Sequence, residues 1–82
     1  MKTVHKLKTV QPFFDAIRSG KKTFEVRLYD RDFKVGDFLA LQEYDPKTQE
    51  YSGEVVYKEI TYILNNNKYC KDGFVILGIK EY

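Results

Sequence analysis

Three charged side chains in one short segment could act together on a ligand. Lys22, Glu25 and Arg27 follow Gly20 in a stretch of alternating polar and apolar residues. Residues two apart in an extended chain share a face, so Glu25 and Arg27 should lie about 7 Å apart on one side. The arginine fork suits a phosphate or a base edge, and the carboxylate can accept from an amine or a ribose hydroxyl. The segment therefore predicts binding of an anionic, nucleotide-like ligand.

A plainer interpretation of the same segment stays open. A solvated strand face that carries an ion pair between Glu25 and Arg27 would contribute only about 0 to 1 kcal/mol and would hold no ligand. Lys21 and Lys22 add positive charge beside the turn in either case.

Several residues elsewhere could belong to the same surface. His5 could line the mouth of a cleft, although a lone histidine on a strand is often structural. Lys8 could reach a phosphate, and Arg31 could contact an anion or be held by the aspartates on either side of it. Tyr44 and Tyr62 could stack on a base, or could simply pack within a small barrel.

The elements that must position these residues follow from the spacing of apolar side chains. Residues 3–8 are predicted to form a strand. Residues 10–19 are predicted to form a helix, with Pro12 in its first turn and Gly20 ending it. Residues 21–29 alternate strictly, which predicts a half-buried strand whose apolar face carries Phe24, Val26 and Leu28.

Three further strands are predicted in the second half of the chain, at residues 38–44, 54–64 and 73–80. The segment 45–53 between the first two carries turn residues, and three asparagines break the chain after Leu64. The last strand is a nearly continuous apolar run, which indicates burial on both faces, and Gly78 within it indicates a bulge or a close backbone approach. The fold class predicted is mainly β (α+β): a small barrel of about five strands with one early helix.

The length and the charge distribution of the chain predict its number of domains and the kind of partner it could bind. At 82 residues, positions 1–82 form a single domain. Residues 1–34 hold nine Lys or Arg and four Asp or Glu, whereas residues 35–82 hold five and eight. An anionic partner would meet the first part, although the asymmetry is also compatible with ordinary solvated charge. The acidic second part could instead meet a protein partner.

Several classes of protein are disfavoured. Cys70 is the one cysteine, so no disulfide can form, and no apolar leader follows Met1; a cytoplasmic protein with no membrane span is expected. One histidine and one cysteine cannot make a zinc site, and a pairing of Cys70 with His5 matches no motif. No glycine-rich phosphate loop or nucleophile elbow occurs. We therefore expect neither a metal nor a cofactor.

The same central segment resembles a known family. Gly20-x-Lys22-x-x-Glu25-x-Arg27 is similar to the signature of ASCH (activating signal cointegrator homology) domains. The resemblance implies a PUA-like β-barrel with a helix packed beside a cleft that binds RNA or a nucleotide-like ligand, and it places Lys22, Glu25 and Arg27 in that cleft. Similarity to a compact bacterial and phage subgroup extends over nearly the whole chain, through His5-Lys6-Leu7-Lys8, Asp30-Arg31-Asp32-Phe33, Val35-Gly36-Asp37, Thr61-Tyr62-Ile63-Leu64 and Gly73-Phe74-Val75-Ile76-Leu77-Gly78-Ile79.

Some relatives in that family resemble enzymes that hydrolyse acylated cytidine with a lysine, a threonine and a later glutamate. Lys22 matches their lysine, but Glu25 stands where they have the nucleophilic threonine, and Thr23 is not the matching residue. A carboxylate cannot replace that hydroxyl within the same mechanism. The resemblance therefore favours a binding module, with a hydrolase acting on modified nucleosides as the alternative.

Overall fold

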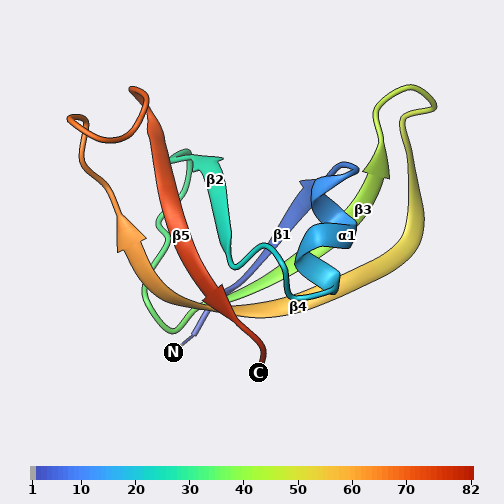
Figure 1. Ribbon diagram of the computed structural model, residues 1–82, viewed down its shortest axis with the longest axis horizontal. Helices are drawn as coiled ribbons and strands as arrows, with labels where there is room; N and C mark the ends of the chain where they lie inside the picture. The colour runs from blue at the N-terminus through green and yellow to red at the C-terminus, as the bar shows by residue number, and fades with distance from the viewer. Residues whose placement is uncertain (1) are drawn as a thin grey trace.

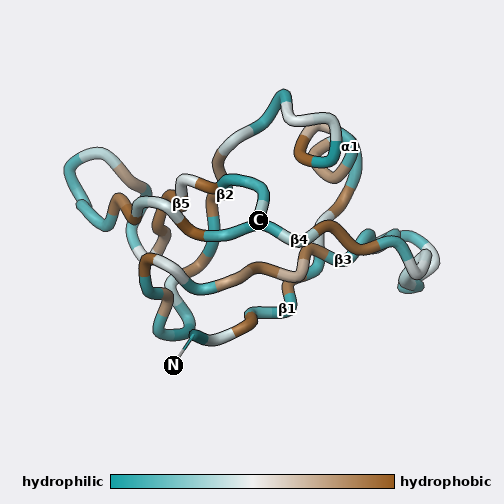
Figure 2. Tube along the Cα trace, turned by 90° about the horizontal axis from the view of Figure 1, so that it is seen from below, coloured by the Kyte–Doolittle hydropathy of each residue, from teal (hydrophilic) through white to brown (hydrophobic). Residues whose placement is uncertain are grey.

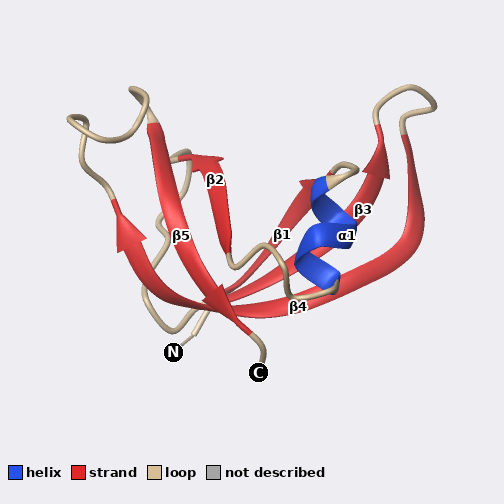
Figure 3. Cartoon of the chain, in the orientation of Figure 1, coloured by secondary structure: helices blue, strands red, loops and turns tan. Residues whose placement is uncertain are grey.

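The computed structural model describes residues 2–82. Five strands and one short helix make up the fold (Figures 1 and 3): β1 (Val4–Thr9), α1 (Phe13–Arg18), β2 (Phe24–Leu28), β3 (Phe38–Asp45), β4 (Glu50–Leu64) and β5 (Phe74–Lys80). The fold is mainly β, as predicted. Within residues 2–82 no helix has the length and apolar character needed to cross a membrane.

All five strands belong to one sheet in the order β1-β3-β4-β5-β2. β1 runs parallel to β3, and the other neighbouring pairs are antiparallel. The sheet curls into a half-barrel: β4, 15 residues long, bends along the bottom, β5 rises on the left and the hairpin between β3 and β4 rises on the right (Figure 1). The end strands β1 and β2 therefore border the open side of the half-barrel.

The hydrophobic core lies on the concave face of the sheet. Alternate residues of β5 point into it, and α1 adds Ile17 where the helix packs near β3. Figure 2 shows the contrast with the hairpin between β3 and β4, which is hydrophilic. The core comprises Leu7, Ile17, Phe33, Leu39, Leu41, Ile60, Val75, Leu77 and Ile79.

The convex face of β5 departs from the sequence prediction. Val75 and Leu77 are fully buried, but Phe74 and Ile76 on the other face are only half-buried. No element among residues 2–82 covers that face as the helices of a layered parallel sheet would. The prediction that β5 is buried on both faces is therefore wrong for its outer face.

Several element boundaries differ from those predicted; β2, for example, spans Phe24–Leu28 rather than residues 21–29. α1 spans six residues rather than the ten predicted, and Gly20 follows it with φ of 83°, as expected for a glycine after a helix. β4 begins at Glu50, so Ser52 and Gly53 lie inside the strand instead of closing a loop.

The prediction for Gly78 is confirmed. The register of β4 against β5 shifts between Ile60 and Tyr62, directly opposite this glycine. A Cβ on Gly78 would lie 3.0 Å from the Thr61 side-chain oxygen. The bulge is carried by β4, and the glycine of β5 leaves room for it.

Candidate ligand-binding groove

The faces of β2 are reversed relative to the prediction. Phe24, Val26 and Leu28 are 44%, 49% and 54% exposed, whereas Glu25 is only 3% exposed. The alternation was read correctly, but the apolar side faces outward and the charged side faces into the half-barrel. Glu25 and Arg27 are thus not a solvated surface pair.

Glu25 is the centre of a buried ionic network. Its Oε1 accepts a hydrogen bond from Lys22 Nζ at 2.8 Å, and its Oε2 accepts one from Arg27 Nε at 2.8 Å. The Lys22 ammonium also donates to the main-chain oxygen of Phe24 at 2.7 Å. Two cations and several charge-assisted bonds offset the cost of taking this carboxylate out of water.

Arg27 extends the network across the open side of the half-barrel. Its Nη1 donates to the main-chain oxygen of Lys8 at 2.8 Å, and its Nη2 donates to Thr9 Oγ1 at 3.0 Å. Both acceptors belong to β1, so a side chain of β2 joins the two end strands, which do not pair with each other. We call this junction, formed by Lys8, Thr9, Glu25 and Arg27, the seam.

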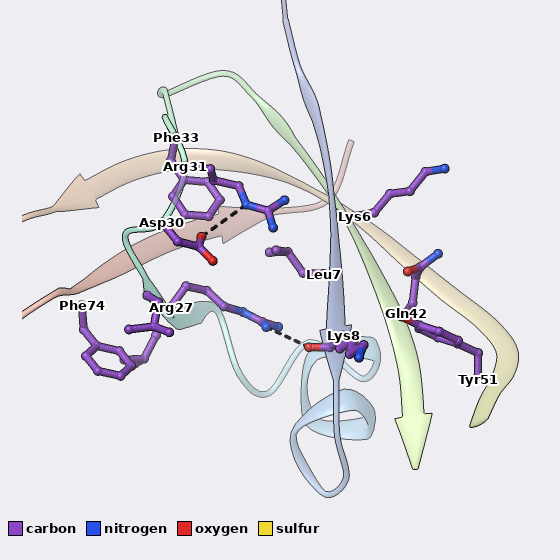
Figure 4. Close-up of a pocket in the computed structure, with 12 residues that line it drawn as sticks. Lys6, Leu7, Lys8, Arg27, Asp30, Arg31, Phe33, Gln42, Tyr51 and Phe74 are labelled. Carbon is purple, nitrogen blue, oxygen red and sulfur yellow. Dashed lines mark hydrogen bonds and ion pairs between the residues drawn. The ribbon is translucent and has the colours of Figure 1, made fainter. Parts of the chain in front are cut away.

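A basic groove runs beside the seam. It has a volume of about 460 Å³ and is lined by the cations Lys6, Lys8, Arg27 and Arg31 against a single carboxylate, Asp30. Figure 4 shows Arg27 and Arg31 reaching from one side toward β1. Asp30 approaches Arg31 Nε at 3.4 Å, which leaves the groove with an excess of positive charge.

An apolar groove of about 400 Å³ adjoins it. Val10 and Phe13, next to and within α1, form one wall with Phe24 and Val26 of β2 opposite, and Lys22, Glu25 and Arg27 also contribute to its lining. This groove therefore lies between α1 and β2, where the resemblance implied a cleft. Lys8, Val26 and Arg27 line both grooves.

His5 lines neither groove. It is 5% exposed, its Nε2 lies 2.9 Å from Asp37 Oδ2, and its ring packs 4.8 Å from the ring of Phe33. Burial raises the pKa of Asp37, but hydrogen bonds from His5 and from the main-chain amides of Thr3 and Lys34 outweigh burial and hold that pKa below its usual 3.8. The structural alternative for His5 is the one that its surroundings favour.

The remaining predicted residues are dispersed. Lys21 is exposed and lines neither groove, and Tyr62, 66% exposed, lies on the outer face of β4 opposite Gly78. Tyr44 lies under Lys8, whose Nζ is 4.4 Å from the ring centroid. Among residues 2–82 no three His, Cys, Asp or Glu side chains cluster as metal ligands.

The groove residues that were not predicted as site residues include Lys6, Thr9, Phe13 and Phe24. The period of β1 held a signal for two of them, because residues two apart share a face of a strand. Lys6 and Lys8 lie on its exposed face, and Thr9 lies on its buried face. Phe24 was predicted on the apolar face of its strand, and nothing in the sequence marked that face, or Phe13 in the predicted helix, as exposed.

Comparison with known proteins identifies the family. Residues 4–79 match the family described as "Domain of unknown function (DUF3850)". The chain belongs to this family. It is also 31% identical over 77 residues to the "Uncharacterized 12.9 kDa protein in GpA 3'region" of Escherichia phage P2, a match that covers 94% of this chain and 68% of the phage protein.

Proposed function

We propose that this chain is a cytoplasmic, ASCH-type, PUA-like module that binds RNA or a nucleotide-like ligand in the two grooves beside the seam. The observation that carries the proposal is the basic groove, where four cations face one carboxylate. The similarity of Gly20-x-Lys22-x-x-Glu25-x-Arg27 to the ASCH signature supports the same surface independently of the groove's charge.

Lys6 and Lys8 are the best candidates for contacts to phosphate. Both are exposed on β1, and the ion pairs found within residues 2–82 involve neither of them. A phosphate that displaced counterions there would gain affinity without breaking an ion pair between the described residues.

Arg27 and Glu25 take a supporting role in this proposal. Arg27 already donates to Glu25, Lys8 and Thr9, which occupies most of its guanidinium N–H groups. Its contribution is to fix β1 against β2, so that the lysines of β1 stand at a constant distance from the wall formed by β2.

The test is RNA binding measured by fluorescence anisotropy with a labelled 12-nucleotide RNA across a salt series. Affinity should fall as salt rises, and the double variant Lys6→Ala/Lys8→Ala should lower the slope of log K against log salt by about 1 to 1.4. Lys8→Ala retains the main-chain oxygen that Arg27 uses, so the seam stays intact.

A charge-matched control is available in the loop between β4 and β5. Lys68→Ala/Lys71→Ala removes the same charge from positions that line neither groove and should leave the salt slope unchanged. Equal losses in the two double variants, or binding that does not respond to salt, would refute the proposal.

The geometry gives less support to a hydrolase acting on modified nucleosides. Lys22 Nζ is already engaged in hydrogen bonds to both Glu25 and the Phe24 carbonyl. Glu25 is likewise occupied by Lys22 and Arg27, so neither group is poised for acid–base work.

A further inference from the structure

The apolar groove has the composition of a site for a flat, uncharged ring. Phe13 is 51% exposed and Phe24 is 44% exposed, and both line it beside Val10 and Val26. Exposed aromatic faces that lie together in a hollow are costly in water, and base stacking is a common use of such faces in proteins that bind single strands.

The Lys22 ammonium lies near both rings. Its Nζ lies 5.8 Å from the ring centroid of Phe13 and 4.6 Å from that of Phe24. The same ammonium is held by Glu25 and by the Phe24 carbonyl, so the cation cannot leave easily. The two rings therefore line the groove together with a lysine that is already hydrogen-bonded, and a base can stack on the ring surface that Lys22 leaves uncovered.

The two grooves are neighbours that differ in chemistry. They share Lys8, Val26 and Arg27; the basic groove adds Lys6 and Arg31, whereas the apolar groove adds aromatic faces. Each volume falls within the range of about 300 to 1,000 Å³ that is typical of small-ligand pockets. One polymer unit with a charged part and a flat apolar part could fill both at once.

A nucleotide in a duplex cannot meet both demands. The bases of an A-form helix are stacked and paired, so their faces are hidden, whereas the bases of single strands can be splayed out onto aromatic side chains. We propose that the two grooves together select single-stranded RNA. One base leaves the stack of its own strand and stacks on Phe13 and Phe24, and the neighbouring phosphates contact Lys6, Lys8 and Arg31. This inference rests on the RNA-binding function proposed above.

The experiment compares four ligands with the unmodified chain: three labelled RNA ligands are measured by anisotropy, and the fourth, which has no fluorophore, is measured by competition with the labelled single strand. They are an 8-nucleotide single-stranded RNA, the same RNA paired with its complement, a strand of equal length that is abasic throughout, and inorganic triphosphate. The single strand should bind about tenfold more tightly than the duplex and about tenfold more tightly than the abasic strand, which retains the phosphates.

Variants locate the base. Phe13→Leu and Phe24→Leu should each weaken binding of the single strand about tenfold and leave the salt slope unchanged, because no charge is lost. Tyr62→Leu is the matched control: it removes an exposed aromatic ring that lines neither groove, and it should change nothing.

The possible failures can be told apart. If no RNA binds in a salt-dependent manner, the proposed function falls and this inference falls with it. If the single strand, the duplex and the abasic strand bind equally with a normal salt slope, RNA binding stands and the base site is overturned. Tighter binding of triphosphate than of RNA would also overturn it, because the apolar groove would then be idle.

Discussion

Glu25 accepts hydrogen bonds from two cations in its own segment while being nearly closed to solvent. Burying a charge in this way rarely adds much net stability, because desolvation consumes most of the attraction. Its effect is geometric: Glu25 holds one edge of the Arg27 guanidinium, and the other edge donates to Lys8 and Thr9 on β1. One carboxylate thereby orients the side chain that joins the ends of the sheet.

The cost of losing that carboxylate can be measured. Glu25→Gln would leave Lys22 and Arg27 without the opposing charge, and it should lower the free energy of unfolding by about 2 to 4 kcal/mol. Glu54→Gln is the control, since Glu54 is an exposed partner of Arg18 at 3.5 Å and its loss should cost no more than about 0.5 kcal/mol. Urea unfolding followed by circular dichroism gives both values, and equal effects would contradict the network described here.

Asp37 predicts a loss of stability in acid. Its pKa is lowered in the folded protein, so the folded state binds its proton less readily than the unfolded chain does. The stabilisation is complete above the unfolded value near 3.8 and is lost as the pH falls through the lower folded value. Asp37→Asn should therefore be less stable than the unmodified chain at pH 7, and the difference should shrink as the pH falls below about 4.

The comparison uses urea unfolding midpoints at several pH values between 7 and 2. Asp72→Asn, at an exposed loop position, should follow the unmodified chain throughout. If the difference in urea midpoint between Asp37→Asn and the unmodified chain stays constant with pH, the substitution acts through altered packing and hydrogen bonding rather than through the titration of Asp37.

At the scale of the element, β2 is an edge strand that points its charges inward. Inward-pointing charge is one of the devices that keep exposed strand edges from pairing with other molecules. On β2 it also explains why Phe24, Val26 and Leu28 stay at the surface. The alternation gives the period of the strand, but a period cannot say which side meets the core.

Because the apolar face of β2 is exposed, the same substitution should have a small effect at Val26 of β2 and a larger effect at the buried Val75 of β5. Val26→Thr, on the outer face, should change the free energy of unfolding by no more than about 0.5 kcal/mol. Val75→Thr, at a fully buried position of β5 that pairs with Arg27, should cost about 1 to 3 kcal/mol because it buries a hydroxyl. Urea unfolding measures both, and a larger loss at Val26 would restore the arrangement first predicted.

The strands themselves were largely predictable, for a physical reason. Their patterns are local: residues 21–29 alternate, and Gly20 marks the end of the helix with a conformation that glycine adopts readily. The start of β4 was missed because Ser52 and Gly53 are typical turn residues, yet they lie in a strand here. Pairing with β3 outweighed local preference there, as tertiary context often does.

At the scale of the whole molecule, the site depends on how far the sheet curls. Lys8, Glu25 and Arg27 could be nominated from the sequence one at a time, but the contact between Arg27 and Lys8 joins residues 19 apart on strands that do not pair. No local pattern encodes that approach. Phe13 and Phe24 were missed for the same reason, since they line the same groove only after the half-barrel has formed.

The strand order has a consequence for the timing of assembly. In the sheet formed by residues 2–82, β2 pairs with β5 alone, and β5 is the last strand to be synthesised. A nascent chain can therefore bring β1, β3 and β4 together while residues 24–28 still lack a partner strand. The wall that carries Arg27 and Phe24 takes its place only when residues 74–80 have left the ribosome, so a growing chain has no groove to offer a ligand before then.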